Sequence, residues 1–395
     1  MKGLLKSLKV LSSAPSFRFE KSSKKAITTK NYGDFLLLVI PLALSLFGAL
    51  MVYSASKYTA EITYGNKYYF LKKQLIGVGI GAAAMVFTAN FNYLNLKKFR
   101  YPLLIISLVM LALVFTPIGV ENYGARRWIK FFGVTIQPSE IVKFAFVIYA
   151  SAYFSNNPER ALSFKGILPI IGVGGIICAL IMLEPNMSIT VCVGAVMLIM
   201  LFSAGVKFKH LFLIVTPLII LAPILIIIEP YRLKRLLAFI NPWASPKGEG
   251  YQLLQSLYAL GSGGLFGTGL FNSRQKYRFL PFAESDFILS VIGEESGFFG
   301  SAVLFIVIGF LVYRGVVAAA KCKSYFGTLL GIGIISVFAV QAGVNALVVT
   351  GSIPPTGLPL PLISSGNTSI IVFLSAFGAL YNLSRDKDRV LPLNA

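Results

Sequence analysis

The chain has 395 residues, of which 56% are hydrophobic and only 13% are charged, and its formal net charge is +21. Soluble domains are about 45–50% apolar and about 25% charged, so this composition excludes an ordinary soluble domain and indicates a protein embedded in a membrane. Cys178, Cys192 and Cys322 suggest no disulfide framework, and a single histidine makes an ordinary zinc site unexpected.

Ten apolar stretches are long enough to cross a membrane, which takes roughly 20 residues. We therefore expect an all-α integral membrane protein with about ten transmembrane helices, in which residues 35–385 form one membrane domain. The stretches lie near 35–55, 74–92, 101–119, 138–155, 166–184, 187–205, 210–230, 286–313, 325–350 and 364–383.

The charges between these stretches predict the orientation of the chain. Residues 1–34 carry eight Lys and Arg and no long apolar run, which indicates a basic cytoplasmic tail before a retained first helix. With the N-terminus inside, 21 of the 36 Lys and Arg fall in cytoplasmic segments, and residues 386–395 form a cytoplasmic C-terminal tail. Basic residues in short segments between spans suit anionic lipid headgroups and an anionic substrate better than nucleic acid.

A segment ahead of the fourth stretch combines Gly124-Ala-Arg-Arg-Trp with Gln137-Pro-Ser-Glu. Pro138 is well placed to start a helix. Arg126 and Arg127 either anchor the outer interface or contact a substrate. Glu140 and Lys143 lie one turn apart and can pair, which favours a structural role.

The longest connection, residues 231–285, is predicted to lie outside, between the seventh and eighth helices, and to pack back on the bundle as a cap. It contains an amphipathic pattern over Tyr251–Leu260 and then a glycine-rich run. Because Arg and Lys bind phosphate oxygens, its two basic clusters are candidates for holding a diphosphate, and contact with water or lipid headgroups is the alternative. The clusters are Arg232, Lys234 and Arg235, and Arg274, Lys276 and Arg278.

Asp286 follows this basic loop, at the outer end of the eighth stretch. A carboxylate in that position either caps the helix or acts on a substrate at the membrane surface. Glu294 and Glu295 lie two turns deeper, where acidic residues are costly and functional by default. The structural alternative for them is an ion pair with a lysine such as Lys143.

The stretch before the last predicted helix is rich in proline and cannot be a regular helix. Irregular backbone at membrane depth is tolerated where it lines a cavity. Ser364 and Ser365 in this stretch, with Gln341 and Asn345 one turn apart in the ninth helix, are candidate substrate contacts. For Gln341 and Asn345 the alternative is hydrogen bonding between helices.

Taken together, these segments resemble the SEDS family (shape, elongation, division and sporulation), which includes FtsW, RodA and SpoVE. The resemblance covers roughly residues 35–385, and two of its segments are nearer to the FtsW and SpoVE branch than to the elongation branch. Those two are Gly124–Lys130 and Asn272–Lys276; the others are Gln137–Lys143, Tyr251–Leu270, Leu280–Gly297 and Gly357–Ser369.

The resemblance implies a peptidoglycan glycosyltransferase of a bacterial inner membrane that polymerises lipid II during cell division or sporulation. It makes Asp286 the essential catalytic residue, and a class B penicillin-binding protein the transpeptidase partner beside other division proteins. The chemistry makes Asp286 the expected general base of an inverting displacement. A divalent cation, Mg²⁺ or Mn²⁺, is a candidate cofactor whose ligands the sequence does not name. A lipid II flippase and a noncatalytic scaffold are the alternatives.

The sequence departs from the family pattern at three places. Asn186 stands where the family often has an aspartate after Pro, which argues against a catalytic role there. Gly366-Asn367 replaces a double glycine, and Glu284-Ser285 precedes Asp286 where His-Thr is common. None of these departures removes Asp286.

Overall fold

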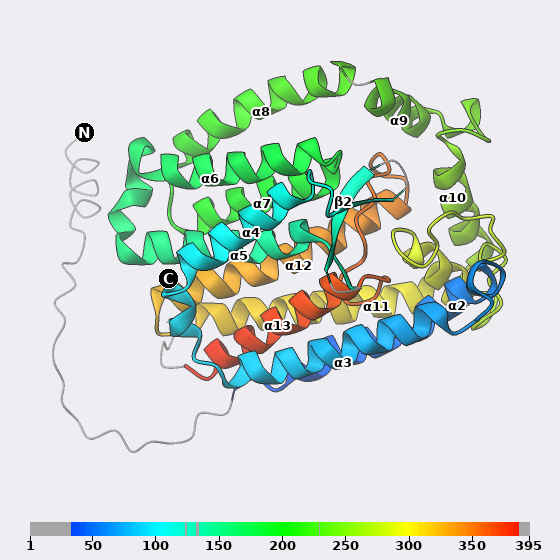
Figure 1. The fold of residues 1–395 in the computed structure, drawn as a ribbon, viewed down its shortest axis with the longest axis horizontal. Coiled ribbons are helices and arrows are strands. Elements are labelled where there is room, and N and C mark those ends of the chain that lie inside the picture. Colours follow the sequence, from blue (N-terminus) through cyan, green and yellow to red (C-terminus); the bar gives the residue numbers. More distant parts are fainter. Residues whose placement is uncertain (1–32, 123–124, 132–133, 229, 387–395) are drawn as a thin grey trace, which may run out of the picture. The chain divides into compact units, whose positions relative to one another are not determined.

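The computed structural model describes residues 33–122, 125–131, 134–228 and 230–386. The predicted tails at 1–34 and 386–395 therefore lie almost wholly outside the described residues. The described chain is mostly helical, as expected (Figure 1). Its α-helices are α2 Leu36–Tyr64, α3 Tyr69–Asn90, α4 Arg100–Leu113, α5 Pro138–Asn156, α6 Phe164–Leu183, α7 Met187–Ser203, α8 Phe208–Ile228, α9 Pro230–Ile240, α10 Tyr251–Gly263, α11 Ile288–Ala320, α12 Tyr325–Val349 and α13 Asn367–Ser384, and its 3-10 helices are η1 Tyr93–Lys97, η2 Pro158–Leu162 and η3 Pro242–Ala244.

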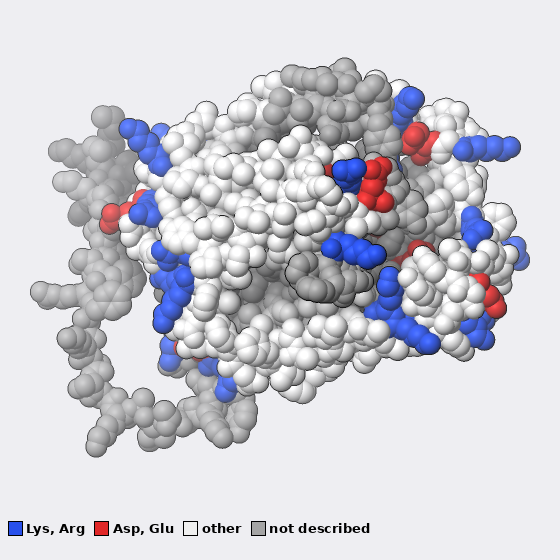
Figure 2. Space-filling model, viewed as in Figure 1, with Lys and Arg blue, Asp and Glu red and all other residues white. Residues whose placement is uncertain are grey.

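Each of the ten predicted stretches overlaps one helix of 14 residues or more, and α9 and α10 lie in the long connection. Six helices in the described residues are long and apolar enough to cross a membrane, namely α2, α3, α6, α11, α12 and α13. Figure 2 shows Lys and Arg gathered toward the two ends of the visible face, with an uncharged band between them. The chain is therefore a multi-pass membrane protein, while the number of spans and their orientation stay predictions.

The centre of the bundle lies around α12. Of the residues in its most apolar segment, 61% are buried, a larger share than in the other five of these helices. Phe338 of α12 packs edge to face against Phe373 and Phe377 of α13, with ring centroids 6.0 and 5.2 Å apart. On its other side α13 packs closely along α3, and a Cβ at Gly378 would come 2.1 Å from Oγ1 of Thr88. Small residues at such contacts let helix backbones approach in a membrane.

A three-stranded antiparallel sheet, which the all-α expectation missed, precedes α5. Its strands are β1 Gly119–Asn122, β2 Ala125–Phe131 and β3 Val134–Ile136, in the order β1-β2-β3. Strands this short give little alternating pattern to find in a sequence. Since neighbouring strand residues point to opposite faces, Arg126 turns outward to Glu121, at 3.4 Å, while Arg127 turns to the bundle.

The long connection packs back on α11, as predicted for a cap. Helix α11 is kinked at Gly297, where φ is 70°. The carbonyl oxygens of Glu294 and Glu295, next to the kink, accept bonds from the amides of Thr268 and Gly269 at 2.9 and 3.1 Å. We call the end of the bundle that carries α9, α10 and the 264–287 loop the cap end, which lies at the right of Figure 1.

Candidate functional site

Asp286 lies at the cap end, two residues before α11 begins. The N-cap residue of α11 is Phe287, and this helix start has no side-chain cap. The capping alternative for Asp286 is therefore wrong. Its carboxylate lies instead against Gly357, where an added Cβ would come 3.2 Å from Oδ2. Gly357 has φ +76°, a conformation that favours glycine, so this close approach depends on the absence of a side chain.

The irregular backbone of residues 352–366 is held by amides of α12. Nδ2 of Asn345 donates to the backbone oxygens of Asp286 and Leu358 at 2.8 and 2.7 Å. Nε2 of Gln341 donates to the backbone oxygen of Pro359 at 3.1 Å. Both side chains are fully buried, which favours the hydrogen-bonding alternative, and their contact with substrate stays a prediction. They fix the backbone on which Asp286 rests.

The two serines of this segment fix the chain just ahead of Asp286. The hydroxyl of Ser364 donates to the backbone oxygen of Ser285 at 2.6 Å and accepts from the amide of Leu360 at 2.8 Å. The amide of Ser365 donates to the backbone oxygen of Glu284 at 2.9 Å. Ser364 is buried and its hydroxyl bonds within the protein, and its contact with substrate stays a prediction. The partly exposed Ser365 stays a candidate.

Glu140 and Lys143 form the ion pair that their spacing indicates, with Nζ and Oε1 3.0 Å apart and both side chains 1% exposed. Lys143 also donates to Oε1 of Gln341 at 2.5 Å. The pair on α5 thus orients the amide that holds Pro359. Lys143 is consequently not the partner of Glu294 or of Glu295.

The electrostatic environment of Asp286 comes from five sources. Burial raises the pKa of Asp286 to about 6 and is the largest cause, and the Glu284 carboxyl raises it further. Arg127 and Arg235 act in the opposite direction, as does a hydrogen bond from Ser285. Burial also raises the pKa of Glu284. At neutral pH Asp286 is then mostly ionised and is a stronger base than an ordinary aspartate.

Arg127 and Arg235 reach this site from different elements. Nε of Arg127, on β2, donates to the backbone oxygen of Glu184 at 3.2 Å, between α6 and α7. Nη1 of Arg235, on α9, donates to the backbone oxygen of Pro355 at 3.3 Å, and Nε lies 3.9 Å from Glu249. One arginine of each sequence segment thus acts on the charge of Asp286, whereas Arg126 is half-exposed and paired with Glu121.

The second basic cluster belongs to a different place. Glu294 accepts from the amide of Arg274 at 2.9 Å, and Oε1 of Glu295 lies 3.9 Å from Nζ of Lys276. Lys276 is 7% exposed and also donates to the backbone oxygen of Phe271. Its charge is thus buried beside an acid, and its role as a diphosphate ligand stays a prediction.

Arg274 and Arg278 are exposed, and Nη2 of Arg278 donates to Oγ1 of Thr63 on α2 at 3.2 Å. Neither is among the charges that act on Asp286. The two clusters do not bracket the aspartate as the sequence suggested. Of the first cluster, Lys234 is exposed, and the side chain of Arg232 lies outside the described residues.

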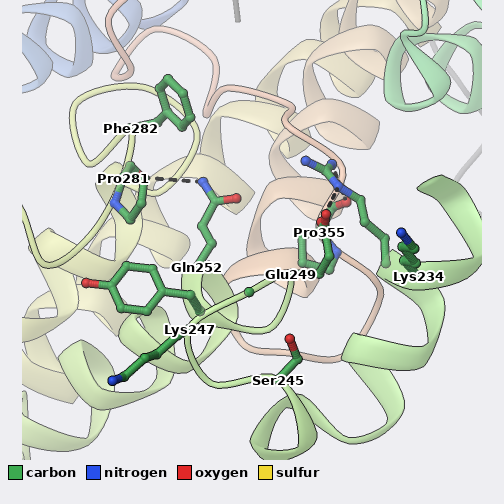
Figure 3. Close-up of a pocket in the computed structure, with 11 residues that line it drawn as sticks. Lys234, Ser245, Lys247, Glu249, Gln252, Pro281, Phe282 and Pro355 are labelled. Atoms are coloured by element: carbon green, nitrogen blue, oxygen red, sulfur yellow. Dashed lines mark hydrogen bonds and ion pairs between the residues drawn. The ribbon is translucent and has the colours of Figure 1, made fainter. Parts of the chain in front are cut away.

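A pocket of about 500 Å³ opens beside the site (Figure 3). Lys234, Arg235 and Lys247 supply its positive charge, and Glu249 is its one acid. Its wall includes Pro355, two residues from the glycine that contacts Asp286. Among the described residues, no three His, Cys, Asp or Glu side chains are grouped so as to hold a metal ion.

Sequence reasoning missed Gly357 and Glu184. Gly357 had no signal beyond its place in a proline-rich stretch. Glu184 is buried, both of its carboxylate oxygens lack a hydrogen-bond partner, and burial raises its pKa to about 8. The available signal was the Glu-Pro-Asn turn between two apolar runs. This turn is tied to the site because Ser188 donates to the backbone oxygen of Thr356.

Comparison with known proteins places these features in a wider group. Residues 34–389 match the model of the family described as "Cell cycle protein", which is that of FtsW, RodA and SpoVE. The chain is 38% identical to "Stage V sporulation protein E" of Bacillus subtilis, over 91% of this chain and 98% of that protein. It is 40% identical to "Probable peptidoglycan glycosyltransferase FtsW" of Trichlorobacter lovleyi, over 89% and 93% of the two chains.

Solved structures show the same fold. A chain from a structure described as "Structural coordination of polymerization and crosslinking by a peptidoglycan synthase complex" is 27% identical, with a TM-score of 0.74 and coverage of 90% of this chain and 98% of that one. The rod shape determining protein RodA of Thermus thermophilus is 24% identical, with a TM-score of 0.66 and coverage of 90% and 98%.

Proposed function

The chain belongs to the FtsW, RodA and SpoVE family, and on that premise we propose that it is a peptidoglycan glycosyltransferase that polymerises lipid II at the outer face of a bacterial inner membrane. The observation that carries the proposal is the Asp286 carboxylate, which caps no helix, lies on backbone held by buried side chains and is under the electrostatic influence of Arg127 and Arg235. The names of the relatives support the same activity. Division and sporulation are the settings that these relatives suggest.

In the proposed reaction, the 4-hydroxyl of one lipid-linked disaccharide attacks the anomeric carbon of the growing glycan. Asp286 accepts the hydroxyl proton as the new C–O bond forms, and the bond to the diphosphate breaks, so that undecaprenyl diphosphate leaves. A single displacement inverts the anomeric carbon and needs no covalent nucleophile. General-base help of this kind is worth roughly 10²–10⁴-fold in rate. Arg127 and Arg235 place positive charge where the diphosphate develops negative charge.

A divalent cation fits the donor set at this place. Glu284 offers carboxylate oxygens beside Asp286, which stays free as the proposed base, and Mg²⁺ is typically bound by one or two carboxylates together with substrate phosphates. When bound, Mg²⁺ or Mn²⁺ would neutralise diphosphate charge. The residues of this chain keep their own roles: Asp286 holds the proton, and Asn345 and Ser364 fix the backbone around it.

The proposal includes an arrangement in the membrane and a partner. Both termini lie in the cytoplasm and residues 231–285 lie outside. A cysteine placed at Lys247, which is exposed, in a variant without the three native cysteines should react with an impermeant reagent in intact cells. Reaction only after lysis would reverse the orientation. A class B penicillin-binding protein is the proposed transpeptidase partner, among other division proteins, because a neighbouring fold comes from a peptidoglycan synthase complex.

The direct test is polymerisation of labelled lipid II by the purified protein, with and without such a partner. Glycan strands resolved by gel electrophoresis are the expected product. A flippase would transfer lipid II across vesicle membranes and form no polymer under either condition. A scaffold would do neither. Absence of polymer with an active partner present would overturn the proposal.

A further inference from the structure

The pocket beside Asp286 has an excess of positive charge that the proposed reaction does not use. Three cations and one acid line it, and that acid, Glu249, lies 3.9 Å from Arg235. Lys234 and Lys247 are exposed and form no ion pair with any described residue. A hollow with two uncompensated ammonium groups is suited to an anionic group.

The pocket shares its walls with the backbone that positions Asp286. Phe282, which lines the pocket, accepts a bond from the amide of Ser285 at 3.1 Å through its backbone oxygen. Nε2 of Gln252 donates to the backbone oxygen of Pro281 at 3.3 Å, and both residues line the pocket. A group bound there therefore lies beside the backbone that positions Asp286.

The shape of the pocket distinguishes among anionic groups. Lys234 and Lys247 lie on opposite sides of it, with Glu249 and Gln252 between them (Figure 3). Gln252, Ser245 and Tyr251 add hydrogen-bonding side chains to the lining. A compact diphosphate is held best by convergent donors, whereas separated ammonium groups with amide and hydroxyl groups between them suit an extended chain with more than one carboxylate.

We propose that this pocket binds the peptide branch of the lipid-linked substrate through its carboxylates. The inference rests on the proposed function, since it assigns a part of that substrate. The pocket lies between α9, η3 and α10, in the connection that caps the bundle. The diphosphate must stay at the membrane surface with its prenyl chain, so the branch that extends away from the membrane is the part that reaches the cap.

The test compares lipid II that has free peptide carboxylates with its carboxamide analogue. The wild-type protein should have a lower KM for the free-carboxylate form. Lys234→Gln and Lys247→Gln should each reduce this preference by up to about 5-fold, the range for exposed charge pairs. The double variant should use both forms almost equally. Lys130→Gln removes an exposed lysine on β2, outside the pocket, and should keep the wild-type preference.

A second measurement does not depend on polymerisation. A fluorescent muramyl pentapeptide without the lipid should bind the purified protein, and the double variant should bind it more weakly than the Lys130→Gln variant. Equal binding by both would overturn the inference even if the protein were not a polymerase. Equal losses for both lipid II forms would assign the lysines to the diphosphate or to lipid headgroups. A loss seen only with a transpeptidase present would assign the pocket to a protein contact.

Discussion

Two groups of acidic side chains flank the start of α11, and the protein uses them in opposite ways. The carboxylates of Glu294 and Glu295 are buried and accept bonds from Ser273, the amide of Arg274 and Ser54. Asp286 is only partly buried, and it is the backbone around its carboxylate that the protein holds. The difference teaches that acids close to one helix start can serve the fold in different ways: Glu294 and Glu295 tie the cap to α11 with their side chains, whereas the protein holds Asp286 through its backbone.

The largest expected effect is on polymerisation activity, and it separates Asp286 from the pair Glu294 and Glu295. Asp286→Asn keeps the shape of the side chain and removes its basicity, so lipid II polymerisation should fall by about 10²–10⁴-fold, or about 3–5 kcal/mol in the barrier. Abundance in the membrane and thermal stability should match the wild type. Glu121→Gln is the control, because it changes an exposed acid that pairs with Arg126 and leaves the proposed base and its neighbours. Polymerisation by Asp286→Asn at the wild-type rate would refute the catalytic assignment.

The next prediction separates the two groups of acids by their effect on the stability of the folded protein. Glu295→Ala leaves the ammonium group of Lys276 buried without its acid, and breaking a buried pair costs about 3–5 kcal/mol. The variant should melt earlier and be cleaved by protease within 264–287, and its residual activity should follow the folded fraction. Glu121→Ala breaks an exposed pair and should do neither. Unchanged stability for Glu295→Ala would show that the cap does not depend on this acid.

The pH dependence of the reaction gives a smaller effect. Burial raises the pKa of Asp286 to about 6, and the ionised form is the active base. The kcat/KM for lipid II should therefore be level above pH 6 and fall about tenfold for each pH unit below it. Arg127→Gln removes a charge that lowers this pKa, so the fall should begin at a higher pH. A wild-type profile level down to pH 4 would exclude Asp286 as the base.

The smallest effect concerns the exposed arginines of the second cluster. Arg274→Gln and Arg278→Gln should change KM for lipid II by less than about 2-fold, because neither charge acts on Asp286. Arg235→Gln, which loses its bond to the backbone oxygen of Pro355, should raise KM more. Steady-state kinetics on the three purified variants decide this. Equal increases in KM for all three variants would indicate that the second basic cluster also binds the diphosphate.

The helices and the Glu140–Lys143 pair were predictable because their signals are local. Apolar runs of 20 residues, Pro138 at a helix start and the 140/143 spacing each depend on a few adjacent residues, and the structure has the corresponding helices and ion pair. The short sheet before α5 was not predictable in this way, because its strands are held by pairing across a turn rather than by a pattern within each.

The partners of the polar residues were the hardest to predict. Gln341 and Asn345 were interpreted as facing a cavity, although they bind backbone oxygens of a segment that follows 13 or more residues later. Lys276 was grouped with its basic neighbours in sequence, although its partner Glu295 belongs to the next helix. A sequence shows which groups need a partner, but the fold decides which partner each one meets.

Gly357 has a consequence for how variation in this protein would be interpreted. A Cβ at this position would come 3.2 Å from Asp286 in a backbone conformation that already disfavours side chains. In a saturation mutagenesis screen, inactivating alleles should therefore cluster in 352–366, a stretch that supplies no reacting atom in the proposed chemistry. A score based on distance in sequence from Asp286 would miss these alleles, whereas a score based on distance in the folded structure would identify them.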